Sequence, residues 1–222
     1  MFDKQNSNNP NLSIIIPVYN EAESVVELHR EIVSALKRIN RTYEIIFVDD
    51  GSTDKTPSQL LLLSPVTIIR FRRNFGQTAA LDAGIKHARG VYIVTLDGDG
   101  QNDPADIPKL LKKIEQETLD VVAGWRKERK DSFSKRFASK TAAFARRILI
   151  DDGIHDSGCT LKIFRRECFE HVDLSGEMHR FIPAMSTLTD SSVTEIVVNH
   201  RARQFGESKY GIGRAWRGFF DI

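Results

Sequence analysis

Short apolar runs alternate with amphipathic stretches along most of the chain. Most of the runs are nearly continuous in apolar residues, and all but the run at 66–71 stop at Pro, Asp or Gly, so we expect strands that are buried on both faces. They cover residues 12–16, 43–48, 66–71, 91–96 and 121–124. The stretches between them repeat apolar residues at helical spacing. Five such strand–helix units predict an α/β fold with a doubly wound, mostly parallel sheet flanked by helices.

Two of the expected helices begin with capping residues. Asn20, followed three residues later by Glu23, resembles a capping box and predicts that the first helix starts there. Asp103 is expected to be an N-cap, because Pro104 follows at the first helical position. With the apolar spacing, the four helices expected in this part of the chain cover residues 20–39, 56–63, 77–87 and 103–117.

The pattern is less regular after residue 124. There we expect a basic helix over residues 132–150, strands over 161–164 and 193–198, and a loop over 205–210. We expect a second substrate to bind among these later elements.

Polar residues lie within three positions after the end of four of the expected strands. They are Tyr19, Asp50, Asn74 and Asp97. In doubly wound sheets ligands bind beyond the carboxyl ends of the strands, so we expect these side chains to line one crevice. Asp50 has a simpler alternative role, as the N-cap of the helix that follows it.

Composition is that of a globular chain, since 41% of the 222 residues are hydrophobic and 28% are charged. Residues 1–11 are polar and lack the apolar run of a secretory signal, so we expect a mobile N-terminal segment before one domain over residues 12–212. The chain has two cysteines, and no apolar stretch approaches the ~20 residues that span a bilayer. Together these features favour a cytoplasmic setting.

Positive charge is concentrated in one stretch, although the formal net charge is only +2. Residues 126–147 hold nine Lys or Arg against one Glu and one Asp. The aromatic residues of this stretch, Phe133, Phe137 and Phe144, recur at near-helical spacing, so we expect them to face a core instead of stacking on bases. We therefore expect no nucleic-acid partner.

Asp97 and Asp99 come directly after an apolar strand and are separated by Gly98, which lets the backbone turn so that both carboxylates face one point. Two close carboxylates repel each other, and Mg²⁺ or Mn²⁺ relieves this repulsion while it binds substrate phosphates. We expect Gln101 to add a carbonyl ligand or an outer hydrogen bond. The alternative is a polar turn, since Asp and Gly dominate turns.

Other metal and phosphate motifs do not fit the sequence. A calcium loop of the EF-hand type would need Gly and Glu where the chain has Asn102 and Pro108. The first strand–helix turn lacks G-x-G-x-x-G, and the sequence contains no G-x-x-x-x-G-K-[ST]. Nicotinamide cofactors and P-loop hydrolysis are therefore disfavoured.

Several motifs together resemble glycosyltransferase family 2. They are Ile16-Pro17-Val18-Tyr19-Asn20-Glu21, Val48-Asp49-Asp50-Gly51-Ser52, Asn74-Phe75-Gly76 and Leu96-Asp97-Gly98-Asp99-Gly100-Gln101. Three later motifs are similar to the polyprenyl-phosphate glycosyltransferase branch, which includes dolichol-phosphate mannose synthase: Gly124-Trp125-Arg126, Asp156-Ser157-Gly158-Cys159 and Phe205-Gly206-Glu207-Ser208-Lys209-Tyr210. The resemblance implies a GT-A catalytic domain over residues 12–212 and inversion at the anomeric carbon by single displacement.

The resemblance also implies which residues bind the donor. The nucleobase and ribose would contact Pro17, Tyr19, Glu21 and Asp50. Asp97 would contact both donor and metal, and Asp99 and Gln101 would contact the metal.

The leaving nucleoside diphosphate requires a cation, and Arg126 is the first candidate. Asp156 would orient the acceptor, whose phosphate oxygen is already anionic and needs little help from a base. The resemblance implies that Arg136 and Ser139 contact phosphate groups of donor or acceptor; the alternative for Arg136 is a solvated helix face. Arg203, Ser208 and Lys209 are expected to pair with the acceptor phosphate from a loop that closes over the site, and the alternative is an ordinary basic loop.

The resulting hypothesis is an inverting hexosyltransferase that uses a UDP- or GDP-linked sugar and a polyprenyl phosphate, undecaprenyl or dolichyl, at the cytoplasmic face of a membrane. The alternative is a family 2 enzyme that acts on a soluble saccharide or protein acceptor. Residues 213–222 mix basic and aromatic residues as interfacial segments do, so we expect contact with a membrane surface. In the related branch transmembrane helices commonly follow this region. The sequence leaves open whether the chain forms a homo-oligomer.

Overall fold

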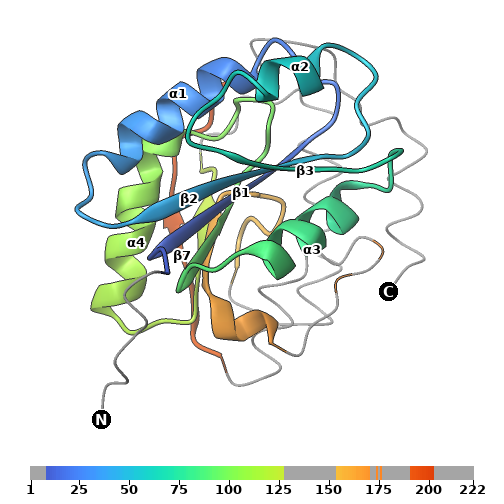
Figure 1. Cartoon of the computed structure of the whole chain (residues 1–222). Helices are drawn as coiled ribbons and strands as arrows, with labels where there is room; N and C mark the ends of the chain where they lie inside the picture. Colours follow the sequence, from blue (N-terminus) through green and yellow to red (C-terminus); the bar gives the residue numbers. More distant parts are fainter. Residues whose placement is uncertain (1–8, 128–153, 171–173, 175, 177–190, 203–222) are drawn as a thin grey trace.

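The computed structural model describes residues 9–127, 154–170, 174, 176 and 191–202, which form a seven-stranded sheet with helices on both faces (Figure 1). The strands are β1 (Leu12–Val18), β2 (Tyr43–Asp49), β3 (Thr67–Arg70), β4 (Tyr92–Thr95), β5 (Val121–Trp125), β6 (Lys162–Arg165) and β7 (Val193–Val197). The α-helices are α1 (Val25–Leu36), α2 (Thr56–Leu60), α3 (Gln77–His87) and α4 (Ile107–Gln116). Two 3₁₀ helices are η1 (Pro104–Asp106) and η2 (Arg166–Phe169). Within these described ranges, no helix is both long and apolar enough to cross a membrane.

The strands follow one another across the sheet in the order β3-β2-β1-β4-β6-β5-β7. β3, β2, β1 and β4 pair in parallel, which confirms the predicted doubly wound, mostly parallel arrangement. The second half departs from a simple succession of units, because β6 enters between β4 and β5 and is antiparallel to both. As a result, the chain that leads into β6 reaches the carboxyl end of β4, where the hydroxyl of Thr95 donates to the carbonyl of Thr160 at 2.7 Å.

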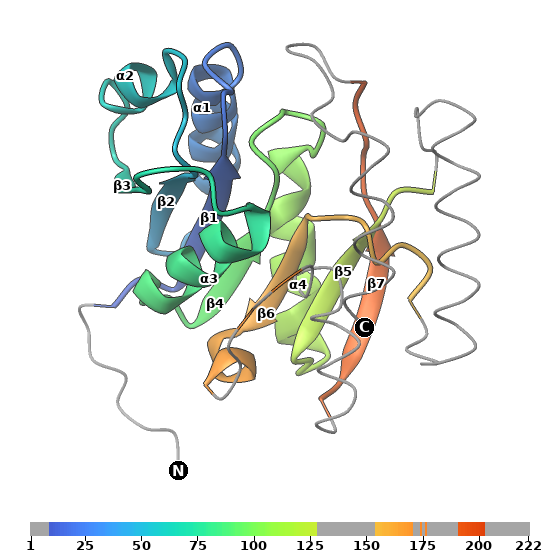
Figure 2. The same ribbon diagram turned by 90° about the vertical axis from the view of Figure 1, so that its right-hand side faces the viewer.

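Helices cover both faces of the sheet. α1 and α4 lie on one face, and α3 packs on the other against β1 and β2 (Figures 1 and 2). β1 lies between β2 and β4, and its side chains alternate between the two cores. Ile14 and Ile16 belong to the core under α1 and α4, whereas Ile15 belongs to the core under α3. This two-sided burial explains why the run at residues 12–16 is almost free of polar residues.

The predicted start of the first helix is wrong. α1 begins at Val25, and Asn20 takes a left-handed backbone conformation with a φ of 52°. The side-chain oxygen of Asn20 accepts a hydrogen bond from the amide of Thr53 at 2.8 Å. Asn20 therefore holds the loop after β2, because an Asn side chain can bind distant backbone amides as well as those of a helix that follows it.

The other helix boundaries are close to those predicted. Asp103 caps η1, since its side chain accepts a hydrogen bond from the amide two residues on at 3.0 Å, and α4 then begins at Ile107. α2 ends at Leu60 and not at residue 63. Four predicted segments lie wholly or mostly outside the described residues: 1–11, 132–150, 205–210 and 213–222.

Replacement of Phe47 by alanine tests the core on the α1 side of the sheet. The Phe47 side chain is fully buried in β2, so Phe47→Ala should lower the free energy of unfolding by about 3–5 kcal/mol. Leu61, which is 76% exposed, provides the control, and Leu61→Ala should change this free energy by at most about 0.5 kcal/mol. Guanidinium denaturation followed by circular dichroism measures both. Equal losses in the two variants would contradict this description of the core.

Candidate active site

Three turns meet at the carboxyl ends of the parallel strands, after β1, β2 and β4. Side chains tie these turns together. The hydroxyl of Ser52 accepts a hydrogen bond from the amide of Asn20 at 2.9 Å, and the hydroxyl of Ser24 donates to the carbonyl of Gly98 at 2.8 Å. The polar segments that follow the three strands therefore converge on one edge of the sheet, as predicted.

Asp50 is buried and binds the backbone of the loop that precedes α3. One carboxylate oxygen accepts from the amide of Phe75 at 2.7 Å, and the other accepts from the amide of Gly76 at 2.9 Å. Gly76 has a φ of 99°, a conformation that favours glycine. The alternative role of Asp50 as the cap of α2 is wrong, because its carboxylate faces the loop before α3.

The other residues expected at the nucleobase and ribose lie on the same edge. Pro17 is opposite Val48 in the β1–β2 ladder and lines a small cavity together with Asp97. Tyr19 and Glu21 are half-buried in the turn after β1. These positions bring the predicted donor-binding residues to the same edge of the sheet as Asp97.

Asp97 and Asp99 form a pair of close carboxylates beyond the end of β4. One oxygen of Asp97 accepts a hydrogen bond from the side-chain amide of Gln77 at 2.7 Å, and Asp99 accepts from the backbone amide of Gln101 at 3.0 Å. Burial, followed by the negative charge of Asp99, raises the pKa of Asp97 to about 6. A divalent cation between the two carboxylates would relieve their mutual repulsion, so this pair is a favourable place for one.

The side chains at this site suit Mg²⁺ or Mn²⁺ better than a metal whose ligands all come from the protein. In the part of the chain that the structure describes, no three His, Cys, Asp or Glu side chains gather as a metal site. Mg²⁺ commonly takes one or two carboxylates and completes its shell with water and substrate phosphates, so the pair of Asp97 and Asp99 fits such an ion.

Glycine at position 98 has a different role from the one expected. A Cβ atom at Gly98 would lie 2.6 Å from a side-chain carbon of Val18, so glycine allows the turn to approach the end of β1. The left-handed conformation, with a φ of 72°, occurs at Gly100 instead. Gly98 is therefore needed for close packing against β1, and the left-handed residue of the turn is Gly100, after Asp99.

Arg126 and Asp156 are thirty positions apart in the sequence and form a bidentate ion pair. The guanidinium of Arg126 donates to the two carboxylate oxygens at 2.7 and 2.9 Å, and its backbone amide donates to Asp156 at 3.2 Å. The two side chains are only 12% and 7% exposed. Although burial opposes the charged form, hydrogen bonding to Asp156 raises the pKa of Arg126 above its usual value. The structure therefore places a permanently charged arginine beside this site.

Lys162 is a buried residue at the site that the sequence pattern did not single out. It is 3% exposed and lies at the start of β6, where it pairs with Thr95 of β4. Its ammonium group donates to the carbonyl of Ser157 at 3.1 Å, and burial lowers its pKa to about 8. A signal was available, because a single lysine interrupts the otherwise apolar strand predicted over residues 161–164.

The segment after β7 is held against the turn that carries Gln101. The guanidinium of Arg201 pairs with Glu31 of α1 at 2.7 Å and with Asp103 at 2.7 Å. The backbone amide of Arg201 donates to the carbonyl of Gln101 at 2.9 Å, and the side-chain amide nitrogen of Gln101 lies 3.4 Å from the carbonyl of Arg201. This contact directs the side-chain nitrogen of Gln101 toward the segment after β7.

Five of the residues expected to bind phosphate groups lie outside the described residues: Arg136, Ser139, Arg203, Ser208 and Lys209. The structure therefore provides no position for them. The described part of the candidate site consists of the donor side and the ion pair between Arg126 and Asp156.

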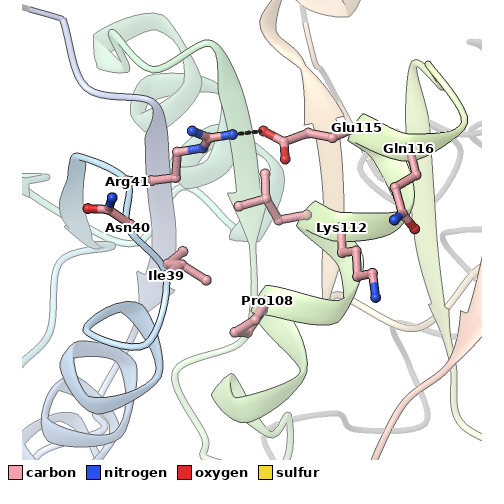
Figure 3. A pocket seen from close by; sticks show the side chains of 8 residues that line it. Ile39, Asn40, Arg41, Pro108, Lys112, Glu115 and Gln116 are labelled. Atoms are coloured by element: carbon pink, nitrogen blue, oxygen red, sulfur yellow. Dashed lines mark hydrogen bonds and ion pairs between the residues drawn. The ribbon is translucent and has the colours of Figure 1, made fainter.

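A larger hollow of about 380 Å³ lies between the C-terminal end of α1 and α4 (Figure 3). Its lining includes Ile39, Pro108 and Lys112, and an ion pair of 3.2 Å joins Arg41 to Glu115 across it. None of the predicted site residues that the structure describes lines this hollow. We therefore place the candidate active site at the carboxyl ends of the strands.

Known proteins resemble this chain over most of its length. A family model described as Glycosyl transferase family 2 matches residues 13–173. Dodecaprenyl-phosphate galacturonate synthase of Rhizobium johnstonii is 42% identical, over 95% of this chain and 65% of that protein. Undecaprenyl-phosphate 4-deoxy-4-formamido-L-arabinose transferase of Salmonella choleraesuis is 36% identical, over 95% of this chain and 66% of that protein. The chain thus spans slightly less than two thirds of the length of these relatives.

Solved structures show the same fold at low sequence identity. Glucosyl-3-phosphoglycerate synthase from Mycobacterium tuberculosis, in complex with Mn²⁺, UDP-glucose and phosphoglyceric acid, has a TM-score of 0.73 at 17% identity and covers 89% of this chain and 73% of its own. A mannosyltransferase from Pyrobaculum calidifontis, in complex with GDP-Man and Mn²⁺, has a TM-score of 0.62 at 19% identity, with coverage of 90% and 59%. With the predicted GT-A fold confirmed and the family model matched over most of the described sheet, the chain belongs to glycosyltransferase family 2.

Proposed function

We propose that this chain is the catalytic region of a metal-dependent, inverting glycosyltransferase that moves a sugar from a nucleotide-diphosphate sugar to a polyprenyl phosphate. The observation that carries the proposal is the close pair of Asp97 and Asp99 at the end of β4, with the bidentate Arg126–Asp156 pair nearby. The charge of Arg126 lowers the pKa of Asp97, against the larger effects of burial and of Asp99. Carboxylates and a fixed arginine at one crevice suit the binding of a diphosphate.

On the donor side, Asp97, Asp99 and Gln101 would hold Mg²⁺ or Mn²⁺, while Pro17, Tyr19, Glu21 and Asp50 border the nucleoside. A bound divalent cation supplies positive charge for the diphosphate that leaves the sugar. The mycobacterial and Pyrobaculum structures contain Mn²⁺ together with UDP-glucose or GDP-Man, which supports a metal and a nucleotide sugar as ligands of this fold.

In the transfer step, a phosphate oxygen of the acceptor forms a bond to the anomeric carbon. The bond from that carbon to the donor diphosphate breaks, and its electron pair remains on the diphosphate. The attacking oxygen is anionic at neutral pH, so no side chain has to remove a proton from it. Arg126 is held in one orientation by Asp156 and would stabilise the charge that develops on phosphate. Arg136, Ser139, Arg203, Ser208 and Lys209 remain our candidates for phosphate contacts.

The acceptor is proposed from the relatives at 42% and 36% identity, whose names specify dodecaprenyl phosphate and undecaprenyl phosphate. A soluble acceptor is the competing outcome, since the mycobacterial enzyme of the same fold was solved with phosphoglyceric acid. Both acceptors present an anionic phosphate, and a direct comparison of acceptors separates them.

A donor and acceptor panel tests the reaction. With Mn²⁺, a short polyprenyl phosphate and either UDP- or GDP-linked sugars, one donor class should give release of nucleoside diphosphate that exceeds the rate with water alone. Asp99→Asn removes one carboxylate charge without a change of shape and should lower this rate by at least about 100-fold. Asp82→Asn, on α3 and paired with Lys86 at 2.9 Å, is the matched control and should retain activity. Equal rates with phosphoglyceric acid or a free saccharide would refute the lipid-phosphate acceptor.

Substitution of Arg126 by lysine tests whether the planar guanidinium is required. Arg126→Lys keeps the charge but loses the bidentate contact with Asp156, so kcat should fall about 100-fold while the KM for the donor changes less. Arg165→Lys, in β6 beside Asp120, is the control and should stay within about twofold of wild type. Steady-state kinetics on both variants measure this, and full activity of Arg126→Lys would remove the proposed role.

We also propose that residues 213–222 bind a membrane surface at its cytoplasmic face, because Arg214, Arg217, Trp216, Phe219 and Phe220 combine positive charge with aromatic side chains. The chain should float with vesicles that contain anionic lipid and should not float with neutral vesicles. Replacement of Trp216 and Phe219 by serine should release it. Flotation that is the same with both lipid types would argue against this surface.

A further inference from the structure

Lys162 is a buried ammonium group without a part in the steps above. Lysine is seldom buried unless it is paired, and this side chain is 3% exposed. Across the sheet Lys162 lies opposite Thr95 of β4 and Ala123 of β5. These two strands lead to Asp97 and to Arg126, so Lys162 lies between the two halves of the candidate site.

The contacts of Lys162 connect it to both halves. On one side its ammonium donates to the carbonyl of Ser157 at 3.1 Å, next to the Asp156 carboxylate that holds Arg126. No other hydrogen bond from Lys162 is present among the described residues, although an ammonium group has three donors. On the other side Lys162 and Asp97 line one small cavity, together with Gln77, Thr95 and Thr160 and with apolar residues such as Leu96 and Phe164.

The size of this cavity limits what Lys162 can do. Its volume of about 10 Å³ corresponds to a single water molecule and is too small for a phosphate or a sugar. Lys162 therefore acts on substrates through its neighbours. The available neighbours are the turn at Ser157 and the carboxylate of Asp97.

The charges of the described site show what Lys162 contributes. Asp97, Asp99 and Asp156 carry three negative charges, and Arg126 and Lys162 carry two positive charges, which leaves a sum of −1. Without Lys162 the sum is −2. The positive charge of Lys162 lowers the pKa of Asp97, in opposition to burial and to Asp99, so the two groups interact electrostatically. A divalent cation would be repelled by Lys162 and attracted more strongly if this lysine were neutral.

We propose that Lys162 is a positioning residue that holds the Asp156–Ser157 turn against the Asp97 side of the site and moderates the affinity of that site for its divalent cation. This inference rests on the proposed function, but its metal-binding part can be measured without a sugar or an acceptor. Removal of the charge has an unusual expected signature: tighter metal binding together with slower turnover.

The test compares Lys162→Met, which keeps the length of the side chain, with Lys162→Arg, which keeps its charge. Binding of Mn²⁺ to the protein alone is followed by electron paramagnetic resonance of the free ion, and kcat is measured with the best donor and acceptor. Lys162→Met should lower the Kd for Mn²⁺ by about 3- to 10-fold and lower kcat by about 10- to 100-fold. Lys162→Arg should restore the Kd to within about twofold of wild type. Lys113→Met, on α4 and paired with Glu117, makes the same change of net charge away from the site and should alter neither value.

Lys162→Gln removes the charge but retains a hydrogen-bond donor, and it replaces the methionine variant if the latter does not fold. It should also tighten Mn²⁺ binding. Unchanged or weaker Mn²⁺ binding in folded Met or Gln variants would overturn the inference, and so would an unchanged kcat in Lys162→Met. If the wild-type chain binds Mn²⁺ but transfers no sugar to polyprenyl phosphate, the proposed function fails, while the comparison of Mn²⁺ affinities still decides the role of Lys162.

Discussion

The Asp97 carboxylate lies beyond the end of a buried strand and beside a second carboxylate, which is unfavourable unless positive charge is close. Arg126 and Lys162 supply that charge, and both lower the pKa of Asp97. Arg126 directly follows β5, and Lys162 lies in β6, which runs antiparallel to both β4 and β5. The site therefore depends on β6, which carries Lys162 and pairs with both β4 and β5, so that Arg126 after β5 also comes to this edge.

A second feature of the site is the use of carboxylates to hold backbone. Asp50 binds two amides of the loop before α3, and Asp156 binds the backbone amide of Arg126 as well as its guanidinium. Asp49 likewise accepts from the amide of Ser52 at 2.9 Å. Hydrogen bonds from amides to charged oxygens are stronger than those between neutral groups. The turns around the crevice are thus held in one arrangement before any ligand binds.

Several features of the fold could be predicted because they depend on short-range pattern. The strands that became β1, β2 and β4 are buried on both faces, so their apolar runs are continuous and easy to recognise. The prediction at Asn20 failed because a left-handed Asn that binds Thr53 has the same local sequence as a helix cap. The position of β6 between β4 and β5 could not be predicted either. Strand order depends on which edges are free after the first strands have paired, and the hydrophobic periodicity carries no information about those edges.

The sequence by itself determined the class of fold, the edge at which polar residues gather and the identity of the two carboxylates, Asp97 and Asp99. These features follow from residue type and from spacing within one strand and its turn. Only the tertiary structure decided that Asp156 would bind Arg126, and that Lys162 would be buried beside Asp97. The reason is physical: an ion pair or a buried charge is stable only when residues distant in the chain exclude water from it and complete its hydrogen bonds.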